Sequence, residues 1–124
     1  EEEGRRRVDE AMEWTGVTHL KGKPTHALSF GQKKRVAIAG VLVMEPSVVI
    51  LDEPTEGIQP SVIQEIGRVI TELKSRMAVL IVEQYLEFVM EIADYCYVME
   101  NGRIIMDGEP EELDQEKLQA TMSL

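Results

Sequence analysis

Two adjacent carboxylates, Asp52 and Glu53, follow directly after the apolar run Val48–Leu51, and Pro54 ends that run. A short β-branched run is typical of a parallel strand that is covered on both faces. In open α/β sheets, chemistry collects beyond the carboxyl ends of such strands. Because side chains alternate along a strand, one acid could serve a metal ion while the other serves a water or a proton. The simpler interpretation is a strand end with two solvated acids.

A second group of chemically useful residues lies upstream, in Leu28–Gln32. Ser29 is placed as an N-cap for a helix over Phe30–Met44, because its hydroxyl can accept a bond from the first backbone N–H groups. A helix start carries a partial positive charge, and Gly31 would let a phosphate come close to the backbone. Taken alone, this pattern favours an ordinary capped helix.

Together the two segments resemble the ABC ATPase family. Leu28–Gln32 is similar to the signature motif, normally Leu-Ser-Gly-Gly-Gln, and the run into Asp52 and Glu53 is similar to the Walker B strand. The two motifs in this order, joined by one helix, are highly specific. The resemblance covers nearly the whole chain but only the C-terminal half or so of the family's domain. Residues 17–55 most resemble ATPases of cobalt and nickel uptake, and residues 56–108 those of urea and branched-chain amino-acid importers.

The resemblance implies a role for each acid. Asp52 would support a Mg²⁺ ion, through water, and Glu53 would polarise the water that attacks ATP. Gln84 follows the second apolar run, where most family members have a histidine that senses the γ-phosphate. A glutamine amide can donate a hydrogen bond to phosphate but cannot carry the charge of an imidazolium. Glu53 and Gln84 are therefore the expected catalytic residues, and Asp52 the expected metal ligand.

The signature segment supplies the expected ATP-binding residues, because in the family this helix start contacts the γ-phosphate of a nucleotide held by the other subunit. These residues are Ser29, Phe30, Gly31 and Gln32. Phe30 stands where the family commonly has a glycine, so we expect a somewhat altered approach of the phosphate.

The expected fold is α/β: a partial P-loop NTPase-like (ABC ATPase) three-layer fold with a mainly parallel sheet and a C-terminal β-hairpin. The strand that leads into the phosphate loop is absent. We expect a single domain over 1–124, divided into a helical signature segment (1–46), a Walker B core with the hairpin (47–108) and a C-terminal helix (109–124). Helices are expected over 1–15, 30–44, 60–76 and 85–94, and strands over 48–51, 78–83, 95–100 and 103–106.

Composition narrows the class of partners. The net charge of −10 argues against nucleic acid and against anionic membranes, since both favour a basic face. No apolar run approaches the roughly 18 residues needed to cross a bilayer, so direct membrane insertion is not expected. The single Cys96 lies in an apolar run and is expected in the core. A cytoplasmic setting follows as the default, peripheral to the inner membrane when part of a transporter.

A complete ABC ATPase needs a Gly-x-x-x-x-Gly-Lys-Ser/Thr loop, and this sequence contains none. Three interpretations compete. The first is a portion of a transporter ATPase that binds MgATP with a second ATPase subunit and a transmembrane permease and powers import. The second is a non-catalytic recombined or engineered fragment. The third, the C-terminal lobe of a DNA-repair or chromosome-organising ATPase, is disfavoured by the acidic balance. We expect the isolated chain to be inactive, and an open sheet edge could make it a homo-oligomer.

Overall fold

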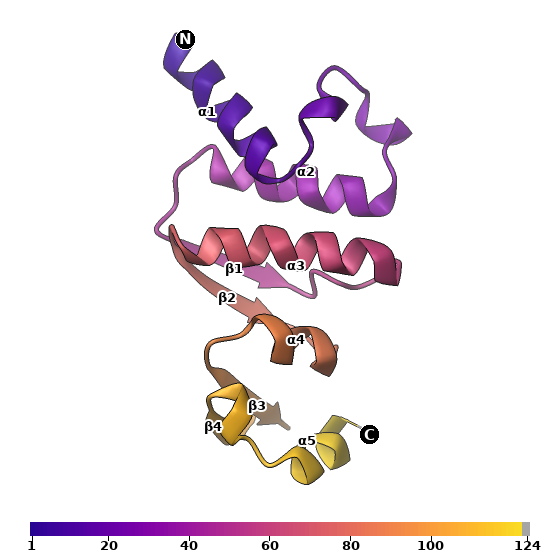
Figure 1. Cartoon of the computed structure of the whole chain (residues 1–124), viewed down its shortest axis with the longest axis vertical. Helices are drawn as coiled ribbons and strands as arrows, with labels where there is room; N and C mark the ends of the chain where they lie inside the picture. The colour runs from indigo at the N-terminus through magenta and orange to yellow at the C-terminus, as the bar shows by residue number, and fades with distance from the viewer. Residues whose placement is uncertain (123–124) are drawn as a thin grey trace. The chain divides into compact units, whose positions relative to one another are not determined.

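The computed structural model describes residues 1–122, which fold into two compact units over residues 1–83 and 84–122. The helices and strands of the first unit are α1 (Glu2–Trp14), α2 (Phe30–Leu42), β1 (Val48–Asp52), α3 (Pro60–Lys74) and β2 (Ala78–Val82). Those of the second unit are α4 (Leu86–Ile92), β3 (Cys96–Glu100), β4 (Arg103–Gly108) and α5 (Gln115–Met122). Figure 1 shows the order of these elements along the chain.

In the first unit, β1 and β2 form a parallel pair, in register from Val48 opposite Ala78 to Asp52 opposite Val82. The crossover between them is α3, which begins with Pro60 at a position where the missing N–H of proline costs nothing. This arrangement confirms the predicted strand, helix and parallel strand. It brings the carboxyl ends of both strands to the same edge of the sheet.

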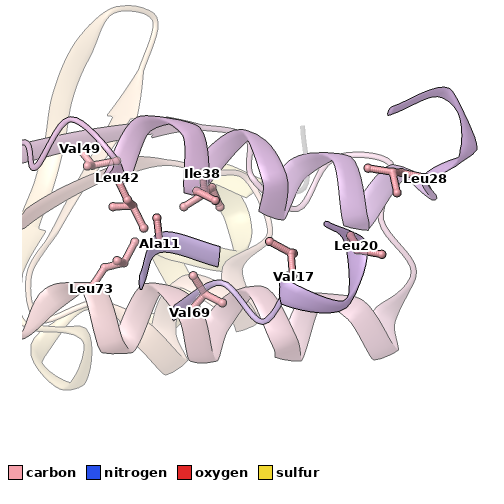
Figure 2. Close-up of a cluster of buried hydrophobic side chains, with 10 residues drawn as sticks. Ala11, Val17, Leu20, Leu28, Ile38, Leu42, Val49, Val69 and Leu73 are labelled. Atoms are coloured by element: carbon pink, nitrogen blue, oxygen red, sulfur yellow. The ribbon is translucent and has the colours of Figure 1, made fainter. Parts of the chain in front are cut away.

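Helices α1, α2 and α3 enclose the core of the first unit. Figure 2 shows Ala11, Ile38, Leu42, Val69 and Leu73 pointing toward one another between these helices. Leu42 is 2% exposed and Leu73 is fully buried. Burial of one such side chain contributes about 1.5–3 kcal/mol to folding. The same cluster reaches the sheet through Val49, so the helices fix the position of β1.

Within the first unit the helices cover only one face of this sheet, whereas the sequence predicts a strand buried on both faces. Val49 is buried with the helical core, whereas Val48, Ile50, Leu80 and Val82 on the opposite face are each more than half exposed. The sequence pattern is that of a strand between two layers, and within the first unit, residues 1–83, the helical layer lies on one face of the sheet.

The second unit contains the predicted hairpin. β3 and β4 pair in antiparallel fashion, and Asn101 (φ 48°) and Gly102 (φ 76°) both have positive φ, as a type I′ turn requires. Cys96 is 8% exposed in a cluster with Val98, Leu113 and Leu118, and burial raises the pKa of its thiol. The expected core role of Cys96 is therefore confirmed.

Two details of the expected fold need correction. The strands of residues 1–122 form two separate two-stranded sheets rather than one mainly parallel sheet, because β3 pairs with its hairpin partner β4 and not with β2. The final helix begins later than expected. Pro110–Glu112 form a short 3-10 turn, and α5 starts after Asp114, whose carboxylate accepts bonds from the N–H groups of Glu116 and Lys117.

A hydrogen bond in the second unit makes its stability sensitive to alkaline pH. Tyr95 Oη donates to Asp107 Oδ2 at 2.6 Å, and this bond raises the pKa of Tyr95 to about 12. The folded state favours the protonated phenol, so this bond adds to the free energy of unfolding. Its contribution is complete below the pKa of about 10 in the unfolded chain and is lost as the pH rises toward 12.

We expect a near-ultraviolet absorbance titration to show one tyrosine that ionises at about pH 12. Asp107→Ala should return that step to about pH 10, the ordinary value for tyrosine. Tyr95→Phe should remove it and so assigns the signal. Tyr85, whose bond to Glu87 also raises its pKa, stays in this variant, so the step at about pH 12 is the one to follow. Its persistence in Tyr95→Phe would contradict the assignment.

Candidate functional site

The two acids lie where β1 ends. Asp52 is the last residue of the strand and is exposed. Glu53 continues the ladder by one bond, because its N–H donates to the carbonyl of Val82 at 2.8 Å. The backbone then turns sharply, since Glu53 has φ 46°, a value that non-glycine residues rarely adopt. The carbonyl of Glu53 accepts a bond from Lys34 Nζ at 2.7 Å and a turn bond from the N–H of Glu56 at 3.1 Å.

The turn after the acids is tied to the end of β2. Thr55 is 7% exposed, and its N–H and Oγ1 both donate to Glu83 Oε2, at 3.1 and 2.6 Å. A buried donor without a partner would lower the free energy of unfolding by about 1–3 kcal/mol. The carboxylate of Glu83 provides the acceptor for both donors of Thr55. Glu83 thus joins the carboxyl ends of the two strands and holds the loop that leaves β1.

The expected ATP-binding segment forms the start of α2. Ser29 is the N-cap: its Oγ accepts from the N–H of Gln32 at 3.3 Å, and Gln32 Oε1 accepts from the N–H of Ser29 at 3.0 Å. This capping box confirms the predicted cap. It leaves the hydroxyl proton of Ser29 able to donate. The N–H groups of Phe30 and Gly31 belong to the first turn, which has no intrahelical acceptors.

Gly31 has a packing role in addition to any role toward phosphate. A Cβ at this position would lie 2.5 Å from Val62 Cγ1 on α3, so only glycine allows α2 to approach α3 this closely. Arg35, one turn further on, pairs with Glu65 of α3 at 3.1 Å. The start of the signature helix is therefore fixed against the helix that follows the acids.

Phe30 is 55% exposed but is not without contacts. Lys34 Nζ lies 5.4 Å from the centre of its ring, within the range of a cation–π interaction. A Cβ on Gly57 (φ 69°) would lie 3.1 Å from Phe30 Cε1. The large side chain at the glycine position of the motif thus lies against the loop that follows the acids.

A Mg²⁺ ion would find only part of its ligands here. Among residues 1–122, no group of three or more His, Cys, Asp and Glu side chains could hold a metal ion. Mg²⁺ commonly takes one or two carboxylates and completes its shell with water and phosphate oxygens. The exposed carboxylate of Asp52 fits that pattern as a single ligand, provided that other groups bring the phosphates.

The structure brings some of the sequence-predicted residues together and not others. The signature residues and both acids belong to the first unit, and Lys34 connects the two motifs. Gln84 is the first residue of the second unit and is exposed. Its catalytic role stays a prediction.

Comparison with known proteins identifies the family. The family model for ABC transporters (ABC_tran) matches residues 1–56. The chain is 50% identical over 119 residues to the energy-coupling factor transporter ATP-binding protein EcfA2 of Clostridium perfringens, covering 94% of this chain and 42% of that protein. The structure of cbiO1 from Clostridium perfringens, described as part of the ABC transporter complex cbiONQ, matches with a TM-score of 0.82 and 52% identity over 87% of this chain and 44% of its own.

A third match is the ADP conformation of MJ1267, an ATP-binding cassette of an ABC transporter, with a TM-score of 0.83 and 32% identity over 99% of this chain and 47% of that chain. The chain belongs to the ABC transporter ATP-binding family and has the fold of the C-terminal part of that domain. It spans less than half the length of the relatives it matches. Within residues 1–122, no helix has the length and apolar character needed to cross a membrane.

Sequence reasoning assigned no role to two residues that the structure places at the site. Lys34 follows Phe30 by four positions, a spacing that puts both on one helix face, and this was the only available signal for their contact. Glu83 was expected as the end of a strand, and its bonds to Thr55 join residues 28 positions apart. No local pattern predicts such a pair.

The two glycines of α2 provide a matched test of the packing role of Gly31. Gly31→Ala should lower the free energy of unfolding by about 1–3 kcal/mol, because its Cβ meets Val62. Gly40→Ala adds a Cβ into open space and should raise the free energy of unfolding by up to about 1 kcal/mol. Urea unfolding followed by the fluorescence of Trp14 reports the unit that holds both. Equal effects of the two substitutions would refute the close approach.

Proposed function

We propose that this chain is the C-terminal portion of an ABC transporter ATPase subunit. In its complete form the subunit binds MgATP between two head-to-tail copies of the domain and hydrolyses it to power import. The observation that carries this proposal is the identity of 50% over 119 residues to an energy-coupling factor ATPase. The site supports it, because two acids follow a parallel strand and a capped helix start lies in the same unit.

Each acid has a proposed role that fits its place. Asp52 is the exposed last residue of β1 and would hold Mg²⁺ through water. When bound, the ion would neutralise charge on the phosphates of ATP. Glu53 would act as the general base that accepts a proton from the attacking water. Its backbone is bonded through both its N–H and its carbonyl, which favours a fixed orientation.

The start of α2 would bind the γ-phosphate held by the other subunit. The hydroxyl of Ser29 and the N–H groups of Phe30 and Gly31 are the available donors, and a helix start favours an anion. Gln32 uses its carboxamide oxygen within the capping box and would act chiefly by fixing Ser29. Gln84 would donate its amide to a phosphate oxygen without adding charge.

The proposed partners are a second ATPase subunit and a transmembrane permease. A relative, cbiO1, is described as part of the transporter complex cbiONQ. We further propose that the complete subunit is peripheral to the inner membrane on its cytoplasmic side, with 1–124 as part of one ATPase domain; the likeness to cbiO1 supports this proposal.

A second candidate is a fragment that is non-catalytic by itself. The sequence has no phosphate-cradling loop, and phosphoryl transfer depends almost wholly on positioning and charge neutralisation. We therefore expect no phosphate release from the isolated chain above a protein-free blank. Release that Glu53→Gln abolishes would contradict this expectation.

The catalytic proposal is tested in a restored domain, in which the chain is joined to the N-terminal part of the Clostridium perfringens EcfA2 relative. Glu53→Gln should lower kcat by about 100-fold or more while ATP still binds, since the amide cannot accept the proton. Glu72→Gln, an exposed acid on α3, is the matched control and should leave kcat unchanged. Wild-type turnover in Glu53→Gln would assign the base elsewhere, and Gln84 would be tested next.

Self-association of the isolated chain is also expected. Among the described residues β1 and β2 pair only with each other, so each has an open edge, and Ile50 and Leu80 are exposed on one face of their sheet. Such edges and faces promote association. Light scattering should give a mass above that of the monomer that rises with concentration. Leu80→Lys should lower it, whereas Ile104→Lys in the second unit should not. A monodisperse monomer at every concentration would contradict this expectation.

A further inference from the structure

Lys34 connects the two motifs of the first unit. It lies on α2 two residues after Gln32, and its Nζ donates to the carbonyl of Glu53 at 2.7 Å. The two residues are 19 positions apart, and the bond is partly buried. A hydrogen bond from an ammonium group is stronger than one between neutral groups. A bond of this kind can constrain the backbone of the residue that accepts it.

The backbone of Glu53 is in a conformation that needs such a constraint. Its φ of 46° lies in the left-handed region, where the Cβ of an L-residue crowds the following carbonyl. Strain of this kind persists only where the surroundings fix it. The N–H of Glu53 is fixed by Val82 and its carbonyl by Lys34, with a turn bond from Glu56 as the second donor.

The other end of the connection is equally well fixed. The ammonium group of Lys34 lies 5.4 Å from the ring centre of Phe30, which itself lies against Gly57. The capping box and the contact of Gly31 with Val62 hold the start of α2 in place. A displacement of the helix start would therefore shift the ammonium group that bonds the carbonyl of Glu53.

The geometry points to Lys34 as a positioning residue that holds Glu53 in its left-handed conformation and couples the signature helix to the orientation of the Glu53 carboxylate. This inference rests on the proposed function, in which the signature helix start contacts one nucleotide and Glu53 acts on another. In this role Lys34 would act through Glu53 and would need no contact with either nucleotide. Binding at the helix start would be transmitted to the general base within one subunit.

The structural half of the inference is tested on the chain itself by nuclear magnetic resonance. The Cα and Cβ chemical shifts of Glu53 report whether its φ is positive. Lys34→Met removes the ammonium group at similar length and should move these shifts toward the values of ordinary turn residues, with faster amide exchange at Glu53. Lys33→Met, the same change at the exposed neighbouring lysine, is the matched control and should leave both unchanged.

The functional half is tested in the restored domain. Lys34→Met should lower kcat by about tenfold or more with KM for ATP unchanged, since a small misplacement of a catalytic group has effects of this size. Lys34→Arg keeps a donor at the same place and should recover much of the rate. A purely structural role would lower the unfolding temperature without this split between kcat and KM and without rescue by arginine.

The outcomes separate the inference from the proposed function. Unchanged Glu53 shifts in Lys34→Met would overturn the inference even if the restored domain hydrolyses ATP. If Lys34→Met alters the Glu53 shifts in the chain but leaves kcat of the restored domain unchanged, the proposed coupling between the signature helix and the Glu53 carboxylate is wrong. A restored domain that lacks ATP hydrolysis without any substitution would overturn the proposed function, and the shifts of Glu53 in the chain itself would then decide whether Lys34 holds its conformation.

Discussion

The parallel pairing of β1 with β2 is the constraint on which the site depends. It places the end of each strand at one edge, where the N–H of Glu53 reaches Val82 and the carboxylate of Glu83 reaches Thr55. The crossover helix α3 makes this pairing possible, because parallel neighbours need a connection of a dozen or more residues. A slip of one residue would exchange the two faces of β1 and expose Val49 in place of Ile50. The buried core therefore sets the direction of both acids.

Helix α2 serves the site at two places at once. Gly31 at its start packs against α3, and Lys34 reaches the turn after β1. Helices α2 and α3, which precede and follow β1 in the chain, are therefore in contact through Gly31 and Val62. The phenylalanine at a position where a glycine is common fits the same arrangement, since its ring fills the space beside Gly57. The motif residues are parts of one packed assembly as well as candidate ligand contacts.

What could be predicted from the sequence follows local rules. The serine cap of α2 and the Asn101–Gly102 turn depend on a few neighbouring residues, and both formed as predicted. The parallel pair followed from one helix between two apolar runs. The exposure of Ile50 was not predictable, because a β-branched run looks the same whether or not a second layer covers it. The bond from Lys34 to Glu53 depends on the fold of 19 intervening residues, and no spacing rule describes it.

Comparison of the strained residues supports a special role for Glu53. Among the described residues, Glu45, Glu53 and Asn101 are the non-glycine positions with positive φ. Glu45 follows the end of α2 and donates to Leu42, as left-handed residues commonly do at helix ends, and Asn101 lies in a turn that requires it. Glu53 begins a turn with Glu56, but a β-turn restricts only its two central residues, so the turn does not demand this φ. The strained backbone of Glu53 is held instead by the bond to Val82 of β2 and by the bond from Lys34 of α2. Backbone strain that the surrounding structure maintains is found mainly at functional sites, which agrees with a catalytic role for this acid.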